Sequence, residues 1–139
     1  MRLFLDSSVL LAASGSSLGA SREIFRRARS NEWTLFTTPY VIEEVLRNLP
    51  KLPPTATAEW ARLRPALLLS DDVVTLDRPA VFERAKDRPI LFSALAWADT
   101  LLTLDRDDFG GLMDKTFYGL AILRPGAFLE RERTAGRLR

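Results

Sequence analysis

The sequence predicts an α/β protein built on a mostly parallel β-sheet of about five strands. Short apolar runs alternate along the chain with segments whose apolar residues recur at helical spacing. The first run, residues 3–5, is apolar at consecutive positions, which is typical of a strand buried on both faces. With 139 residues, the chain has the length of one domain. These three observations together favour a single α/β domain.

The strands are predicted from apolar and β-branched runs that end at polar or turn residues. The expected strands are residues 3–5, 33–37, 73–76, 100–104 and 118–123. Each is separated from the next by a segment long enough for a crossover helix, which parallel strands require. The pattern therefore predicts strands that mostly run in one direction.

Capping residues and prolines mark the helices between these strands. A first helix begins near Val9, with Asp6, Ser7 or Ser8 as its N-cap, and Ser21 caps a basic amphipathic helix. The remaining helices are expected at residues 39–49, at 56–69 with a kink or a split at Pro65, at 79–86, at 87–97 and after 125–126. Proline is favoured at the first helical position, as at Pro39.

Composition restricts the chemistry that this protein can perform. The sequence contains neither His nor Cys, which excludes Ser-His-Asp and Cys-His nucleophile systems, zinc fingers and disulfide frameworks. It contains 18 Asp and Glu residues. Carboxylates are therefore the leading candidate catalytic groups, and a hard cation such as Mg²⁺ is their natural partner.

Several acidic residues fall where an open α/β sheet places its ligands, at the carboxyl ends of the strands. Asp6 and Asp105 directly follow the first and fourth expected strands, and Asp87 precedes a helix that starts at the sheet edge. Glu43 or Glu44 lies on the helix after the second strand, and helical periodicity does not choose between them. The carboxylates of such a cluster repel one another unless cations are bound. Two divalent ions would make the cluster a phosphodiester-cleaving site.

Each of these acids also has a purely structural interpretation. Asp6 and Asp87 fit the role of helix N-caps without any metal. Asp105, together with Asp107 and Asp108, fits a solvated turn. Only their common placement at strand ends favours a site.

Six segments resemble one known family in its order, and together they span nearly the whole chain. The segments are residues 3–11, 19–21, 38–45, 87–94, 98–107 and 123–129. On these segments the chain resembles the PIN domain family, close to the VapC-type toxin ribonucleases. Two departures are Ser7-Ser8, where Asn or Thr is common, and Leu104, where a small residue is common.

The resemblance implies a three-layer α/β/α fold and an endoribonuclease that depends on Mg²⁺ or Mn²⁺. Water would attack the phosphorus and leave a 5′-phosphate and a 3′-hydroxyl. The resemblance assigns metal binding and catalysis to Asp6, Glu44, Asp87 and Asp105, with Asp99 and Asp108 as candidate auxiliary ligands. Arg88 and Arg106, each next to one of these acids, are candidate RNA-binding residues, because phosphates supply most of the attraction.

A toxin-like protein of this family would have RNA as its substrate, a cognate antitoxin as a partner and a second copy of itself in a homodimer. We expect a nuclease domain at residues 1–130 and a basic tail at 131–139. The N-terminus lacks an apolar stretch of signal-peptide length, and the run at 90–98 is too short to cross a bilayer, so a cytoplasmic protein without a membrane association is expected.

Two other functions fit parts of the pattern. A PIN-like module that binds RNA or protein without catalysis would share the fold. A receiver domain or an Asp-x-Asp phosphatase also places acids at strand ends. However, Ser8 stands where the phosphatase needs a second acid. A receiver needs a lysine after a later strand, whereas Lys115 lies in an expected loop.

Overall fold

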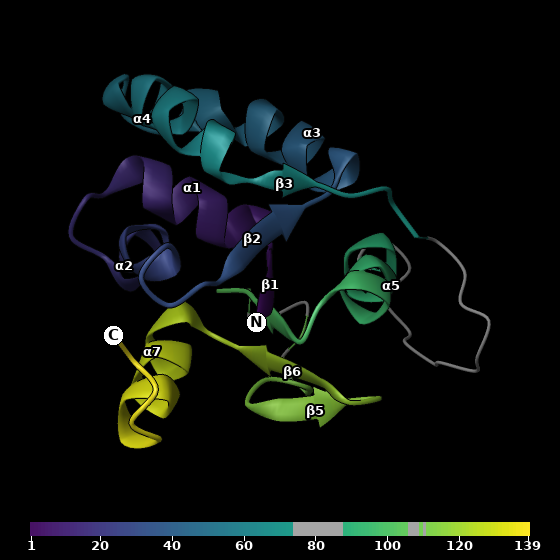
Figure 1. The fold of residues 1–139 in the computed structure, drawn as a ribbon. Coiled ribbons are helices and arrows are strands. Elements are labelled where there is room, and N and C mark those ends of the chain that lie inside the picture. Colours follow the sequence, from purple (N-terminus) through teal and green to yellow (C-terminus); the bar gives the residue numbers. More distant parts are fainter. Residues whose placement is uncertain (74–87, 106–108, 110) are drawn as a thin grey trace.

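The computed structural model describes residues 1–73, 88–105, 109 and 111–139 (Figure 1). The expected helix at 79–86 and nearly all of the strand expected at 73–76 lie outside the described residues. So do Asp87, Arg106 and Asp108, whose predicted roles are therefore untested.

The described chain forms a six-stranded sheet in the order β3-β2-β1-β4-β6-β5. The strands are β1 (Arg2–Leu5), β2 (Thr34–Thr37), β3 (Leu68–Leu69), β4 (Thr100–Leu102), β5 (Lys115–Phe117) and β6 (Leu120–Leu123). Every pairing is parallel except that of β5 with β6. This confirms the predicted α/β class and mostly parallel sheet, and it corrects the strand number from about five to six.

Helices cover both faces of this sheet, so the fold has three layers. They are α1 (Ser7–Gly15), α2 (Ala20–Ala28), α3 (Pro39–Asn48), α4 (Thr55–Leu63), α5 (Arg88–Trp97) and α7 (Pro125–Thr134). Figure 1 shows α1 and α2 on one side of β1, with α5 on the other, where it contacts β1 and β4. In the described part of the chain, no helix has the length and apolar character needed to cross a membrane.

The core is centred on β1, the third strand from one edge of the sheet. Leu3, Phe4 and Leu5 are completely buried, as expected for a strand covered on both faces. The Phe4 ring packs edge-to-face on Phe36 of β2, with 5.4 Å between ring centroids. This central position fixes the end of β1, and therefore Asp6, in the middle of one sheet edge.

Two segments differ from their sequence predictions for identifiable reasons. The helix expected over 56–69 is split near Pro65, as the sequence allowed: it ends at Leu63 and passes into a short 3₁₀ turn at Arg64–Ala66, because Pro65 has no N–H for a further helical bond. Leu68–Leu69 then pairs with β2 as an edge strand. The strand expected at 118–123 begins only at Leu120, as β6, because Tyr118 (φ 49°) and Gly119 (φ 86°) form the turn that joins it to β5 in a hairpin.

The C-terminal residues are part of the folded domain. Helix α7 runs to Thr134 and so includes the start of the tail that was expected from residue 131. Glu132, which is 2% exposed, accepts two hydrogen bonds from Arg137, at 2.7 and 2.8 Å. The backbone N of Arg139 donates to Oδ1 of Asn31 at 2.8 Å. The end of the described chain is therefore bonded to the segment that follows α2.

Candidate functional site

Asp6 lies at the carboxyl end of β1, where the strand passes into α1. Its backbone N donates to the carbonyl of Leu102 at 3.0 Å, which holds it beside the end of β4. Its Oδ1 accepts a 2.7 Å hydrogen bond from the backbone N of Ser7, so Asp6 is the N-cap of α1. The cap expected from the sequence is present, and it leaves Oδ2 for other partners.

The hydroxyls of two neighbouring residues donate to this second oxygen of Asp6. Thr103, just past β4, donates to Oδ2 at 2.7 Å, and Ser8 donates to the same atom at 3.2 Å. Asp6 is only 3% exposed. The buried carboxylate is therefore surrounded by polar donors, and no cationic side chain of the described residues bonds to it. Thr103 is not among the site residues predicted from the sequence.

The environment of Asp6 strongly changes its acidity. Burial raises the pKa of Asp6 from 3.8 to about 6, against the hydrogen bonds from Thr103, Ser7 and Ser8, which lower it. The negative charge of Glu44 raises this pKa further. A carboxyl group that resists ionisation in this way would be stabilised as a carboxylate by a bound cation.

Glu44 of α3 is the second acid at this edge. The Ser7 hydroxyl donates to Oε2 of Glu44 at 2.7 Å and lies 3.5 Å from Oδ1 of Asp6, so it sits between the two carboxylates. Glu43, the alternative that periodicity left open, is 75% exposed and forms a 3.9 Å ion pair with Arg47 on the surface. The structure thus places Glu44, and not Glu43, beside Asp6.

Asp105 follows β4 and lies at the same edge of the sheet as Asp6 and Glu44. Its backbone N donates to the hydroxyl of Thr103 at 3.0 Å, and the N of Leu104 donates to the hydroxyl of Ser8 at 3.0 Å. The loop after β4 is thus tied to the start of α1. Thr103 connects Asp105 to Asp6 through one oxygen atom.

Asp99 is not part of this arrangement, contrary to its predicted role as an auxiliary ligand. It precedes β4, and Oδ2 accepts a 2.7 Å hydrogen bond from the backbone N of Arg2, at the start of β1. Because β1 and β4 are parallel, both residues lie at the amino end of the sheet, opposite Asp6. The sequence places an acid at each end of β4 and does not show which end faces the site.

The donor set suits a hard divalent cation, although the described residues supply only part of it. Among the residues that the structure describes, no three acidic side chains form a group that would hold a metal ion. Asp6 and Glu44 do converge, and carboxylate oxygens are the ligands that Mg²⁺ prefers. The repulsion between these two acids is the feature that a cation would relieve.

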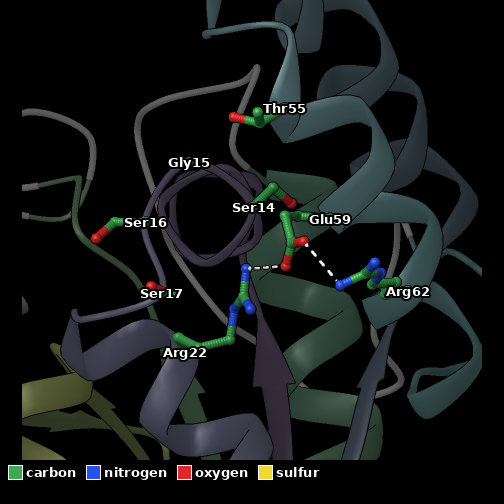
Figure 2. Close-up of a pocket in the computed structure, with 8 residues that line it drawn as sticks. All are labelled: Ser14, Gly15, Ser16, Ser17, Arg22, Thr55, Glu59 and Arg62. Carbon is green, nitrogen blue, oxygen red and sulfur yellow. Dashed lines mark hydrogen bonds and ion pairs between the residues drawn. The ribbon is translucent and has the colours of Figure 1, made fainter.

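A polar pocket of about 440 Å³ lies elsewhere, at the far end of α1 (Figure 2). Figure 2 shows Glu59 of α4 between two arginines, bonded to Arg22 at 2.9 Å and to Arg62 at 3.3 Å. The charges in this pocket are therefore paired with each other, and the contacts connect α2 to α4. We assign it a structural role and place the candidate site at Asp6.

Comparisons with known proteins show what the fold resembles. No family model and no curated protein matches the sequence. The solved structure of VapBC2 from Rickettsia felis, bound to a DNA fragment from its promoter, aligns with a TM-score of 0.60 at 14% identity, over 88% of this chain and 97% of that chain. PAE2754 from Pyrobaculum aerophilum aligns with a TM-score of 0.62 at 18% identity, over 96% of this chain and 90% of that chain.

At such low identity the likeness concerns the fold and not the activity. It extends over most of each chain, and it agrees with the strand order and the layers described above. The expectation drawn from the sequence motifs is confirmed at this level: the protein has a PIN-like fold of the VapC type.

Proposed function

We propose that this protein is an endoribonuclease that depends on Mg²⁺ or Mn²⁺ and acts as the toxin of a toxin–antitoxin pair. The observation that carries the proposal is the pairing of buried Asp6 with Glu44 through the Ser7 hydroxyl, at the carboxyl edge of a PIN-like fold. In an open α/β sheet this edge is where ligands bind.

In the proposed site, Asp6 and Glu44 hold the divalent ions together with Asp105 and Asp87, the last of which lies outside the described residues. When bound, divalent ions would activate water and neutralise charge on the phosphate during its displacement. The chain's own hydroxyls orient the ligands, since Thr103 and Ser8 fix Oδ2 of Asp6 and Ser7 fixes Glu44. No histidine is available to act as a base, which suits a metal-dependent reaction.

The partners proposed for this protein follow from its similarity in fold. The Rickettsia felis structure contains VapBC2 and promoter DNA. By analogy, we propose a cognate antitoxin and a homodimeric state for this chain, with RNA as the substrate. Arg88 and Arg106 remain proposed RNA-binding residues.

Cleavage of RNA by the purified protein tests the proposal. We expect cleavage of total RNA with Mg²⁺ or Mn²⁺ and none with EDTA. Asp6→Asn should lose activity by several orders of magnitude, because one carboxylate ligand becomes a neutral amide. Asp99→Asn is the matched control, since it makes the same change at the opposite end of the sheet and should retain activity.

Two results would contradict the proposal. One is full activity in a folded Asp6→Asn variant, which would remove the acid pair from the reaction. The other is an absence of cleavage with either ion, combined with calorimetry that shows no divalent-ion binding. That second result would favour a PIN-like module that binds RNA or protein without cutting it.

A further inference from the structure

Arg124, which is not among the site residues predicted from the sequence, lies at the same sheet edge as the acidic residues. It directly follows β6 and is the extended N-cap residue of α7. The backbone N of Thr103 donates to the carbonyl of Leu123 at 3.0 Å, so the pairing of β4 with β6 continues to the end of both strands. Arg124 therefore lies directly beside Thr103.

The strand register places three residues in one row across this edge. Leu5 pairs with Leu102, and Leu102 pairs with Leu123, so the next residues, Asp6, Thr103 and Arg124, are neighbours in turn. Neighbours in register on parallel strands point to the same face of a sheet. Because strands are spaced about 4.8 Å apart, the backbone of Arg124 is about 10 Å from that of Asp6, and an extended arginine side chain covers much of that distance.

The charge of Arg124 is not used within the described part of the molecule. Its side chain is half-buried, its Nε is buried without a hydrogen-bond partner, and no described carboxylate pairs with it. Arg137, in contrast, binds both oxygens of Glu132. Leaving a buried donor of a charged group unpaired is costly, and such groups in folded proteins call for an explanation.

We propose that Arg124 binds a phosphate of the RNA strand at the acidic site. This inference rests on the proposed ribonuclease function and deepens it by naming a residue that holds the substrate. A guanidinium matches the geometry of two phosphate oxygens, so it would orient the strand as well as attract it. The row from Asp6 to Arg124 then places a cation next to an acidic pocket, which an anionic substrate requires.

Binding of single-stranded RNA in EDTA separates this role from catalysis. We expect Arg124→Gln to bind a fluorescent RNA oligonucleotide about tenfold more weakly at low salt. Each phosphate contact on a single strand contributes about 0.7 to the slope of log K against log salt concentration, so the slope should become less steep by about that amount. Arg124→Lys keeps the charge and should restore the slope, with only part of the affinity.

Arg133→Gln is the matched control, because it removes the same charge from the same helix at an exposed position. Arg133 is 61% exposed and pairs with Glu130 at the surface. The Arg133→Gln variant should bind RNA with the affinity and the salt slope of the wild type. Thermal unfolding of all variants verifies that Arg124→Gln is folded. If Arg124→Gln is unfolded, the RNA affinity and the salt slope of Arg124→Lys are compared with those of the wild type and of Arg133→Gln.

Two results would overturn the proposal. The first is an Arg124→Gln variant whose salt slope and kcat/KM both equal those of the wild type. This result would exclude the role of Arg124 and leave the proposed ribonuclease function intact. The second is an unchanged affinity of Arg124→Gln relative to Arg133→Gln, or no RNA binding by the wild type at all. A wild type that binds RNA but does not cleave it contradicts the proposed function alone, because the slope in EDTA still decides the role of Arg124.

Discussion

The hydroxyl of Thr103 donates a 2.7 Å hydrogen bond to Oδ2 of Asp6 and so joins the carboxyl ends of β4 and β1. The same oxygen accepts a hydrogen bond from the backbone N of Asp105 at 3.0 Å. A threonine hydroxyl has one donor and two acceptor sites, which permits both bonds at once. One side chain therefore sets the position of one acid and the backbone course of another.

Replacing Thr103 should destabilise the protein and raise the pKa of Asp6 further. Thr103→Val keeps the shape but removes the donor, and the loss should be about 1–3 kcal/mol in the free energy of unfolding at neutral pH, because a buried carboxylate loses a partner. Thr103→Ser retains the hydroxyl and is the control, with a smaller loss. Urea unfolding measures both. Equal stability of the Val and Ser variants would show that this hydrogen bond contributes nothing.

Asp6 should make the metal-free protein less stable as the pH rises. Burial raises its folded pKa to about 6 from 3.8, so the folded state holds the proton more tightly than the unfolded state does. The stabilisation is complete below pH 3.8 and is lost as the pH passes 6, by about 3 kcal/mol in total for a shift of this size.

Asp6→Asn removes this titration, so it should gain stability relative to the wild type between pH 4 and about 7. Unfolding by urea in EDTA at a series of pH values measures the difference, in which other titrating groups cancel. A constant difference across this range would mean that Asp6 ionises normally.

Saturating Mg²⁺ or Mn²⁺ should stabilise the wild type by RT ln(1 + [L]/Kd), where [L] is the free concentration of the ion. The same ion should stabilise Asp6→Asn much less, and urea unfolding measures both.

Glu132 should contribute to stability although it lies far from the acidic edge. It is 2% exposed, and the hydrogen bonds of Arg137 hold its pKa below the usual range. A lowered pKa gives stability that is present above about pH 4.5 and is lost as the pH falls. Glu132→Gln should lower the free energy of unfolding by about 1–2 kcal/mol at neutral pH. The loss is kept to this size because water screens the exposed guanidinium of Arg137.

The control for Glu132 is Glu130→Gln on the same helix. Glu130 is 66% exposed, and its pair with Arg133 is a surface ion pair, which is worth about 0–1 kcal/mol. Denaturant unfolding compares the two variants. If Glu130→Gln costs as much as Glu132→Gln, burial of the carboxylate has no bearing on the stability of α7.

Gly119 should tolerate substitution poorly for conformational reasons alone. Its φ of 86° lies in the left-handed region, and a Cβ would meet nothing within 4 Å, so the cost of Gly119→Ala is backbone strain of about 1 kcal/mol. Gly111→Ala is the control, since that position also has open space but an ordinary φ. A comparison of melting temperatures decides, and equal values would exclude strain in the turn between β5 and β6.

The sequence predicted the class of fold because its signals are local. A consecutive apolar run marked β1, and Pro39 marked the start of α3. The missed elements lacked such signals. β3 has only two residues, and β5 is three residues long with Lys115 and Thr116 exposed, so neither shows a clear alternation.

The candidate site was predicted less completely, because it depends on which strands are neighbours. Periodicity left Glu43 and Glu44 equivalent, and only the contact between Ser7 and Glu44 separates them. Asp99 and Asp105 flank the same strand, and sequence spacing does not show which end meets Asp6. Thr103 and Arg124 become candidates only once the order β1-β4-β6 is known.

The position of β1 in the sheet also has a consequence for the newly made chain. Asp6 is synthesised before its partner Thr103, which lies 97 positions later in the sequence. Contacts this distant form late, because the intervening chain must first emerge and close its loop. A nascent chain that ends before residue 103 holds Asp6 without this donor and leaves one edge of β1 unpaired. For a protein proposed to cut RNA, the acidic edge thus stays incomplete until residue 103 has left the ribosome, which is itself rich in RNA.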